Sequence, residues 1–375
     1  MKILVTGSKG FVGKNLISNL SICDNIEIYE YDRKTTDEEL LNYTKDCDFV
    51  YHLAGVNRTT NEEDFKNGNA LLLNKILNSL KMNNNKCPVL ITSSIQAKLD
   101  NPYGISKKME EDIAFNYADE NNVKVYVYRL NNLFGKWCKP NYNSVIATWC
   151  YNVSHNLDIS VSDRKKELCL CYIDDVCNEF IKCLKDKGTC DEEGFYCVPI
   201  TYNKTLEEIE YLIKSFKENS LGIMVPSTGD DFTKKLYSTY ISYVPVSEMV
   251  VDLNSHCDER GTFCELIRTK ECGQVSISTT KPSILRGEHY HNTKIERFIV
   301  VSGKAKITFE HVIDHTNYEF IVSGDKLQYV TIPVGYQHRI DNIGDTELVL
   351  VLWANELFDP LEPDTYVMKR NKEKK

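Results

Sequence analysis

The first thirteen residues constrain the fold of this chain more than any other segment. Lys2 to Thr6 is a short apolar run, and Gly7, Gly10 and Gly13 follow it at three-residue spacing. Such glycines permit a tight turn, close approach of the backbone to a pyrophosphate, and close packing of a helix on a strand. The amino terminus of that helix presents amide groups to the anion. The residues predicted here to contact a dinucleotide cofactor are Gly7, Gly10, Phe11, Val12 and Gly13.

Strands and helices continue to alternate after this start. A third strand is expected within Asp48–Gly55, and the small residues at its end are suited to lie along an adenine and ribose. A long helix is expected from Asn69 to Leu80. The pattern predicts a doubly wound α/β domain, with its chemistry at the carboxyl ends of the strands. Further strands are expected at 26–31, 88–91 and 123–129. The additional residues assigned to the cofactor are Leu53, Ala54, Gly55 and Asn69.

The second strand ends in Asp32, Arg33 and Lys34, where the residue that contacts the adenosine ribose is expected. An acid there binds the 2′-hydroxyl of NAD, whereas basic side chains favour the 2′-phosphate of NADP. Two cations beside one anion favour NADP. We therefore predict NADPH as the cofactor, bound by Arg33 and Lys34.

A candidate catalytic group follows the fourth strand. On a helix, Tyr103 and Lys107 lie on one face, because they are four residues apart. A free tyrosine has a pKa of about 10, and a nearby cation lowers that pKa toward the range in which a phenol can protonate an oxygen. Ser94, at the end of the strand, can bind the same oxygen. Tyr-x-x-x-Lys also occurs by chance on amphipathic helices, but here it follows a dinucleotide motif.

These motifs together resemble the extended short-chain dehydrogenase/reductase family, whose members mostly act on nucleotide-diphosphate sugars. The shared motifs are Gly7-x-x-Gly10-x-x-Gly13, His52-Leu-Ala-Gly55, Tyr103-x-x-x-Lys107 and Arg129-x-x-Asn132-x-Phe-Gly135. The resemblance implies a catalytic triad of Ser94, Tyr103 and Lys107. It also implies a substrate lobe that includes residues 139–145 and 172–176. The residues assigned to the substrate are Asn132, Asn143, Ser144 and Arg164.

Arg164 can hold a diphosphate through two hydrogen bonds, although a single arginine is also a common surface residue.

The sequence pattern changes near Tyr243, where the alternation of strands and helices ends. Beyond it, short alternating strands are separated by Gly, Asp and Asn, which predicts a small all-β barrel or jelly roll. We therefore expect a reductase domain at 1–243 and a metal-binding domain at 244–375. The expected strands of the second domain are 275–278, 297–301, 304–310, 318–322, 327–332 and 347–353.

Four side chains in this second part have the pattern of a metal site. His289 and His291 point the same way on a strand, so both can reach one ion. Glu296 and His338 complete a set of nitrogen and oxygen ligands that suits zinc and other divalent metals. A lone His-x-His is structural more often than not, but the two further residues favour metal binding.

The same segment is similar to the two cupin motifs. Leu285-Arg-Gly-x-His289 also resembles the sugar-nucleotide 3,5-epimerases of that barrel class, where the matching histidine is a proton-abstracting base. His289 cannot easily be both ligand and base. We favour the ligand role, which leaves the base unassigned.

The order of the two domains, with KWCKPNYNSVIAT and NELFDPLEPDTYV, is similar to the CapF/WbjC family of capsule and O-antigen synthesis. The resemblance implies a bifunctional enzyme that acts on a UDP-2-acetamido-2,6-dideoxy-4-hexulose. The cupin epimerises C3, and the reductase reduces C4 with NADPH. The product is UDP-2-acetamido-2,6-dideoxy-L-talose, on the way to UDP-N-acetyl-L-fucosamine. The alternatives are a reductase with a structural or dimerising cupin, and a sensor of NADPH or nucleotide sugars that does not turn over.

Composition excludes several other classes of protein. The net charge is −9, and no basic segment carries interleaved aromatic residues, which argues against nucleic acid as a partner. No apolar run approaches the length of a membrane span. The start MKILVTG does not resemble a signal peptide, so we expect a cytoplasmic protein, and a homo-oligomer, specifically a dimer. The 14 cysteines include no Cys-x-x-Cys pair and are expected to be buried thiols.

Overall fold

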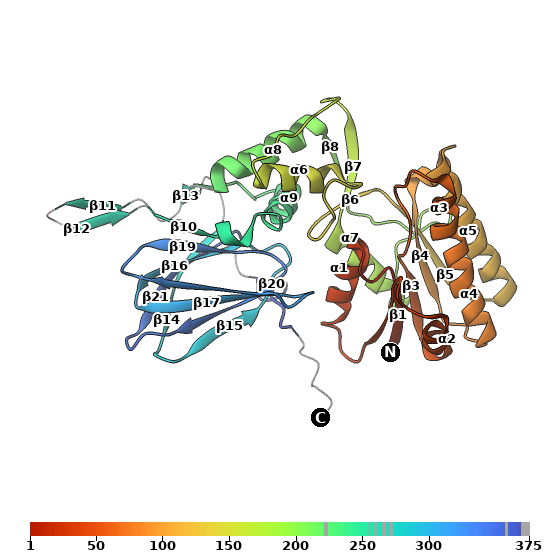
Figure 1. Cartoon of the computed structure of the whole chain (residues 1–375), viewed down its shortest axis with the longest axis horizontal. Coiled ribbons are helices and arrows are strands. Elements are labelled where there is room, and N and C mark those ends of the chain that lie inside the picture. The colour runs from red at the N-terminus through yellow and green to blue at the C-terminus, as the bar shows by residue number, and fades with distance from the viewer. Residues whose placement is uncertain are drawn as a thin grey trace. The chain divides into compact units, whose positions relative to one another are not determined.

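The computed structural model describes residues 1–220, 224–253, 255–258, 261–264, 268–269, 273–356 and 359–368. The chain divides into two compact units (Figure 1). The first contains residues 1–144 and 168–203, and the second contains residues 145–167 and 204–375.

A five-stranded parallel sheet is the centre of the first unit, with strand order β2-β1-β3-β4-β5. Helices cover both of its faces, so a central strand such as β1 is apolar on both sides, and its Ile3, Leu4 and Val5 are buried. The strands are β1 (Lys2–Thr6), β2 (Glu27–Tyr31), β3 (Phe49–His52), β4 (Val89–Ser94) and β5 (Val125–Leu130).

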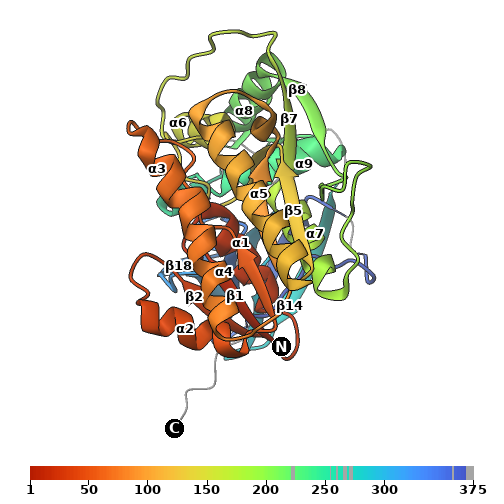
Figure 2. The same ribbon diagram turned by 90° about the vertical axis from the view of Figure 1, so that its right-hand side faces the viewer.

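Helices α1 (Phe11–Leu20) and α7 (Ile173–Lys182) pack together on one face of this sheet. On the other face lie α2 (Asp37–Asp46), α4 (Leu72–Met82) and α5 (Pro102–Asn121) (Figure 2). The amide of Gly104 donates to the Asn101 side chain, which caps the start of α5, and Pro102 occupies its first turn. The smaller elements are α3 (Glu62–Lys66), η1 (Asn67–Leu71), η2 (Ile95–Lys98), η3 (Cys183–Lys185), and a sheet of β6 (Asn132–Phe134), β7 (Glu167–Tyr172) and β8 (Tyr202–Thr205).

In the second unit, three mutually packed helices accompany two antiparallel sheets. The helices are α6 (Val145–Ser154), α8 (Leu206–Ser220) and α9 (Asp231–Ile241). One sheet has the order β10 (Val250–Asp252), β19 (Gln328–Ile332), β16 (Glu296–Ser302), β21 (Leu348–Ala354) and β14 (Gln274–Thr280). The other has the order β15 (Leu285–His289), β20 (Tyr336–Asn342), β17 (Lys304–His311) and β18 (Asn317–Ser323). The remaining elements are β9 (Met224–Val225), η4 (Val246–Glu248), β11 (Ser255–Asp258), β12 (Gly261–Cys264) and β13 (Arg268–Thr269).

The predicted fold class is confirmed in both parts. A doubly wound Rossmann-type sheet is followed by an antiparallel jelly roll of the cupin type. The compact units do not coincide with the expected division at Tyr243, because α6, α8 and α9 belong to the same unit as the jelly roll. The ranges 1–243 and 244–375 stay a prediction about the two functional domains.

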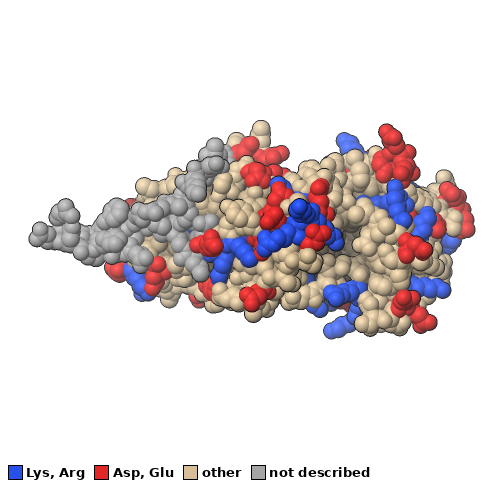
Figure 3. Space-filling model, turned by 90° about the horizontal axis from the view of Figure 1, so that it is seen from above, with Lys and Arg blue, Asp and Glu red and all other residues tan. Residues whose placement is uncertain are grey.

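None of the helices in the described ranges is long and apolar enough to cross a membrane. On the face that Figure 3 shows, Lys and Arg side chains lie interspersed with Asp and Glu.

Candidate active site and metal centre

The glycine-rich turn of the first unit has the shape of a dinucleotide cradle. Gly7 has a φ of +67°, and a Cβ there would lie 2.7 Å from the Ala54 nitrogen. Gly10 caps α1 without a side-chain hydrogen bond, which leaves the helix amino terminus open to an anion. Ser8 is 2% exposed, and its buried hydroxyl has no hydrogen-bond partner among the described residues. A buried hydroxyl without a partner fits a site that a cofactor completes.

The predicted ribose end of this site carries one more cation than the sequence analysis identified. Asp32 accepts a hydrogen bond from the Lys34 amide at 2.7 Å and forms an ion pair with Lys9. The hydrogen bond from Lys9 lowers the pKa of Asp32. Arg33 and Lys34 are exposed. Lys9 neutralises the Asp32 carboxylate, which would otherwise disfavour a 2′-phosphate. The position of Lys9 inside the glycine motif was the signal that could have revealed this role.

Tyr103 lies in the first turn of α5, as predicted, and is half-buried. Its hydroxyl donates a hydrogen bond to Asn57 Oδ1 at 3.2 Å, a residue the sequence analysis did not single out. Ser94 ends β4, where its hydroxyl accepts from the Gln96 amide at 3.2 Å and caps η2. The catalytic roles of Ser94 and Tyr103 stay predictions.

Lys107 is buried beside the end of β4. Its ammonium donates to the Thr92 carbonyl at 2.8 Å and to the Glu110 carboxylate at 2.7 Å. Burial alone would lower the pKa of Lys107, but the charge of Glu110 raises that pKa above its ordinary value. Lys107 therefore stays cationic, as its predicted role requires.

Glu110 connects Lys107 to a second buried group. Its other oxygen lies 3.4 Å from Nε2 of His52, and Nδ1 of His52 lies 3.0 Å from the Thr6 hydroxyl. That hydroxyl already accepts from the amides of Leu53 and Ala54, at 3.2 Å each. Its proton is therefore directed at Nδ1 of His52, which leaves the ring proton on Nε2, facing Glu110. The network joins the predicted catalytic lysine to the strand ends at the predicted cofactor site.

Replacing Glu110 by Ala is expected to lower the free energy of unfolding by about 3–5 kcal/mol, because the Lys107 ammonium would stay buried without its carboxylate. Glu120→Ala on the same helix is the matched control. Glu120 pairs with Lys81 at 2.9 Å in an exposed position, so its loss should cost about 1 kcal/mol or less. Urea unfolding at neutral pH measures both changes, and equal losses would contradict the prediction.

The pH window of this pair follows from the two pKa shifts. Burial alone would raise the pKa of Glu110, but the charge of Lys107 lowers it, so its stabilising effect is present above the unfolded value of about 4.3. That effect is lost as the pH falls through the lowered folded pKa. The effect of Lys107 is present below about 10.4 and is lost as the pH rises through its raised folded pKa.

Asn69, which was assigned to the cofactor, is hydrogen-bonded to the loop that carries Asn57. Its Oδ1 accepts from the Val56 amide at 2.8 Å, and its Nδ2 donates to the Val56 carbonyl at 3.2 Å and to the Ser106 hydroxyl at 2.9 Å. Asn69 is fully buried. Its hydrogen bonds join this loop to α5, and direct contact with a cofactor stays a prediction.

The four predicted substrate residues do not lie in one compact unit. Asn132, Asn143 and Ser144 belong to the first unit, and Asn132 donates to the Cys169 carbonyl at 3.1 Å. Arg164 belongs to the second unit, where it pairs with Glu207 at 3.4 Å and Glu210 at 3.2 Å. A diphosphate at Arg164 would compete with these carboxylates.

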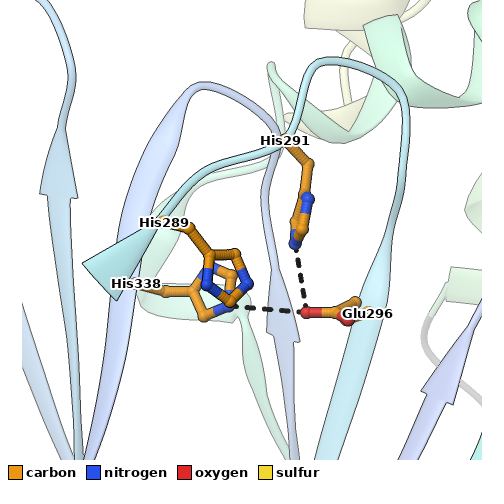
Figure 4. Close-up of side chains that lie close together, drawn as sticks. All are labelled: His289, His291, Glu296 and His338. Carbon is orange, nitrogen blue, oxygen red and sulfur yellow. Dashed lines mark hydrogen bonds and ion pairs between the residues drawn. The ribbon is translucent and has the colours of Figure 1, made fainter. Parts of the chain in front are cut away.

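The predicted metal ligands converge in the jelly roll of the second unit (Figure 4). One ligand atom from each of His289, His291, Glu296 and His338 lies within 4.8 Å of the others. Glu296 begins β16, and its carboxylate lies at the centre, 3.2 Å from Nε2 of His291 and 3.4 Å from Nε2 of His338. A bulge at Glu288, with a φ of +63°, brings His289 opposite His338 on β20.

The protonation states of this cluster suit a divalent cation. Burial, followed by the neighbouring His338 and His291, lowers the pKa of His289 to about 4. Burial also lowers the pKa of His338. Burial alone would raise the pKa of Glu296, but the neighbouring His291 and His338 hold that pKa below its usual range. Both ring nitrogens of His338 are buried without a hydrogen-bond partner among the described residues. Neutral His289 and His338 beside the Glu296 carboxylate are in the state in which these ligands bind a metal.

Comparison with known proteins identifies the family. Residues 3–196 match the NAD dependent epimerase/dehydratase family, and residues 256–366 match the Polysaccharide biosynthesis C-terminal domain. The chain is 38% identical over 366 residues to the UDP-2-acetamido-2,6-beta-L-arabino-hexul-4-ose reductase of Pseudomonas aeruginosa, with 98% of each chain covered. It is 47% identical to the capsular polysaccharide assembling protein CapF from Staphylococcus aureus, whose crystal structure superposes with a TM-score of 0.68 over 99% of this chain and 100% of that one.

The chain belongs to the CapF family. Membership makes it an NAD(P)-dependent enzyme of the epimerase/dehydratase type with a cupin-type C-terminal part. A structure of RMD from Pseudomonas aeruginosa complexed with NADPH is similar in fold, with a TM-score of 0.51 at 21% identity over 58% of this chain and 82% of that one. The CapF family resemblance expected from the sequence is therefore confirmed over nearly the whole chain.

Proposed function

We propose that this member of the CapF family is a bifunctional enzyme acting on a UDP-2-acetamido-2,6-dideoxy-4-hexulose. The reductase part reduces C4 with NADPH, and the cupin epimerises C3. The product is UDP-2-acetamido-2,6-dideoxy-L-talose, a precursor of UDP-N-acetyl-L-fucosamine for capsule or O-antigen. The observation that carries the reductase assignment is the hydroxyl of the half-buried Tyr103 in the first turn of α5, with the buried Lys107 ammonium four residues further on. The relative from Pseudomonas aeruginosa, a reductase of a UDP-linked hexul-4-ose, supports the substrate class.

In the reductase, Tyr103 acts as the general acid. Bound NADPH supplies the hydride for C4. The Tyr103 hydroxyl, which donates to Asn57 in this structure, donates instead to the substrate oxygen and transfers its proton to it. The charge of Lys107 favours the phenolate that results. Gly7, Gly10 and Gly13 admit the pyrophosphate to the backbone, and Lys9, Arg33 and Lys34 provide the charge for a 2′-phosphate.

In the cupin, His289, His291, Glu296 and His338 hold a divalent metal, of which zinc fits the ligand set best. A bound metal would supply positive charge that favours transfer of the C3 proton, which the neighbouring C4 ketone already acidifies, to a base and the return of a proton on the other face. His289 serves as a ligand, because its ring lies 4.6 Å from that of His338 and 5.0 Å from that of His291. Reduction at C4 removes the acidifying ketone, so it preserves the new configuration at C3.

Incubation of the full chain with the UDP-4-keto sugar in D2O tests both activities. Without NADPH, NMR is expected to show hydrogen exchange at C3, and with NADPH the cofactor is oxidised and the L-talo product accumulates. Oxidation of NADPH without C3 exchange would leave a reductase that carries a structural cupin. Binding of both ligands without turnover would favour a sensor.

Removing one cation from the proposed 2′-phosphate site is expected to reduce the preference for NADPH over NADH. A hydrogen bond to a charged group contributes about 1.5–3 kcal/mol, so Arg33→Ala should lower kcat/KM for NADPH by roughly 10–100-fold and leave that for NADH nearly unchanged. Lys45→Ala, an exposed lysine of α2, is the control. Equal losses with both cofactors would argue against the 2′-phosphate assignment.

A further inference from the structure

Residues 363–366, here called the closing segment, pair with the His-x-His segment of the second unit. The Tyr290 amide donates to the Tyr366 carbonyl at 2.8 Å, and the Tyr366 amide donates to the Tyr290 carbonyl at 3.0 Å. The rings of these tyrosines lie 5.6 Å apart. The pairing places the closing segment directly beside the residue between His289 and His291. A segment more than seventy residues away in the chain thus borders the candidate metal centre.

Asp364 holds the loop that leads from His291 to Glu296. Its carboxylate accepts from three successive amides, those of Asn292 at 3.1 Å, Thr293 at 2.8 Å and Lys294 at 2.7 Å. It also accepts from the Thr293 hydroxyl at 3.0 Å. Hydrogen bonds to a charged acceptor are stronger than neutral ones, so this carboxylate organises the whole turn between two metal ligands.

The backbone of Asp364 acts on His291 itself. Nδ1 of His291 lies 2.6 Å from the Asp364 carbonyl oxygen, which can only accept a hydrogen bond. Nδ1 therefore carries the ring proton, and the lone pair lies on Nε2, the atom that faces Glu296. Such a bond orients an imidazole for metal binding and raises its basicity.

Asp364 makes these contacts from a strained backbone conformation. Its φ of +39° lies in the left-handed region, which non-glycine residues adopt rarely. Such a conformation persists where the surroundings determine it, and it is found at functional sites. Lys294 adds a second connection, because its ammonium donates to the Pro363 carbonyl at 2.7 Å and to the Thr365 hydroxyl at 2.9 Å.

We propose that the closing segment is a latch on the metal centre, with Asp364 as the positioning residue that sets the tautomer and orientation of His291. The inference rests on the metal binding proposed above and assigns the tail of the domain a role in metal affinity. The Asp364 carboxylate holds the loop at 292–294 in place. The loop and the Asp364 carbonyl together orient Nε2 of His291 toward the ion. Metal affinity is therefore expected to depend on a residue that is not itself a ligand.

Zinc affinity tests the latch directly, measured on the full chain by competition with a chromophoric chelator. Asp364→Ala is expected to bind Zn²⁺ roughly 10–100-fold more weakly than the wild type. Asp364→Asn, whose amide oxygen can still accept from the loop, should recover part of that loss. Glu362→Gln is the control, because Glu362 is exposed and lies two residues from Asp364, so its affinity should equal that of the wild type. Unchanged affinity in Asp364→Ala would overturn the inference.

Hydrogen exchange on the metal-free chain separates the latch from the metal proposal. The amides of 292–294 are expected to exchange faster in Asp364→Ala, and less so in Asp364→Asn, than in the wild type. Faster exchange in a chain whose wild type takes up no zinc would support the latch and overturn the metal site. Unchanged exchange at these amides would overturn the latch whatever the zinc affinity. If Asp364→Ala does not fold, Asp364→Asn gives both readouts.

Discussion

Replacement of Tyr103 by Phe is expected to lower the rate of NADPH oxidation with the UDP-4-keto sugar by about 10²–10⁴-fold, the usual contribution of a general acid. The change removes one oxygen and keeps the ring, which packs beside Phe65 with centroids 5.8 Å apart. The fold and the cofactor site should therefore survive. Exchange at C3 should continue at the wild-type rate, because the proposed metal centre uses other residues.

The absorbance of NADPH reports the first activity of this variant, and NMR in D2O without NADPH reports the second. Tyr211→Phe is the matched control, because Tyr211 is 72% exposed on α8 and loses the same oxygen. Wild-type oxidation by Tyr103→Phe would remove Tyr103 from the mechanism. Loss of both activities would show that the two reactions are not independent.

Replacement of His338 by Ala is expected to abolish C3 exchange and to release the metal. His338 is 1% exposed, and its ring nitrogens lack hydrogen-bond partners among the described residues, so the cation is its expected partner. Loss of a ligand should weaken zinc binding by more than the roughly 10–100-fold typical of an outer-shell residue. Oxidation of NADPH with a sugar already epimerised at C3 should be retained.

Metal content and C3 exchange are measured together for this variant. His315→Ala is the control, because His315 is 63% exposed and bonds to Glu310 outside the cluster. A His338→Ala protein that loses its metal but keeps C3 exchange would make the metal structural. The same experiment on wild type treated with a chelator checks that the result does not depend on the substitution.

Much of the architecture was predictable because local sequence patterns specify its strands, turns and helices. The apolar run before Gly7 and the spacing to Gly13 require a strand, a tight turn and a helix, and the structure has all three. The short alternating strands after 273 were equally clear, since alternation specifies one buried face. That α6, α8 and α9 belong to the same compact unit as the jelly roll was not predictable, because an amphipathic pattern shows that a helix has a partner but not which partner it has.

The candidate sites were likewise predictable where local sequence patterns specify them, and not where they depend on tertiary contacts. The four predicted metal ligands could be proposed from the sequence because their spacing is local or matches a motif, and their side chains converge in the structure. Lys9, Asn57 and Asp364 were missed, because each acts through a partner distant in the chain or through a backbone group. Glu110 lies only three residues from Lys107, but the sequence does not show that packing buries this pair. Arg164 was assigned to a diphosphate by its residue type, whereas the structure pairs it with Glu207 and Glu210.

The sequence by itself determined the family, the two fold classes and the side chains able to carry the chemistry, because these depend on residue type and short spacing. Only the tertiary structure decided the charge and the tautomer of those side chains. Lys107 is held as a cation because folding buries Glu110 against it, and His291 has its lone pair on Nε2 because Asp364 returns from the end of the domain to accept from Nδ1. The burial of the Lys107–Glu110 pair and the contact between His291 and Asp364 arise only when distant segments pack together.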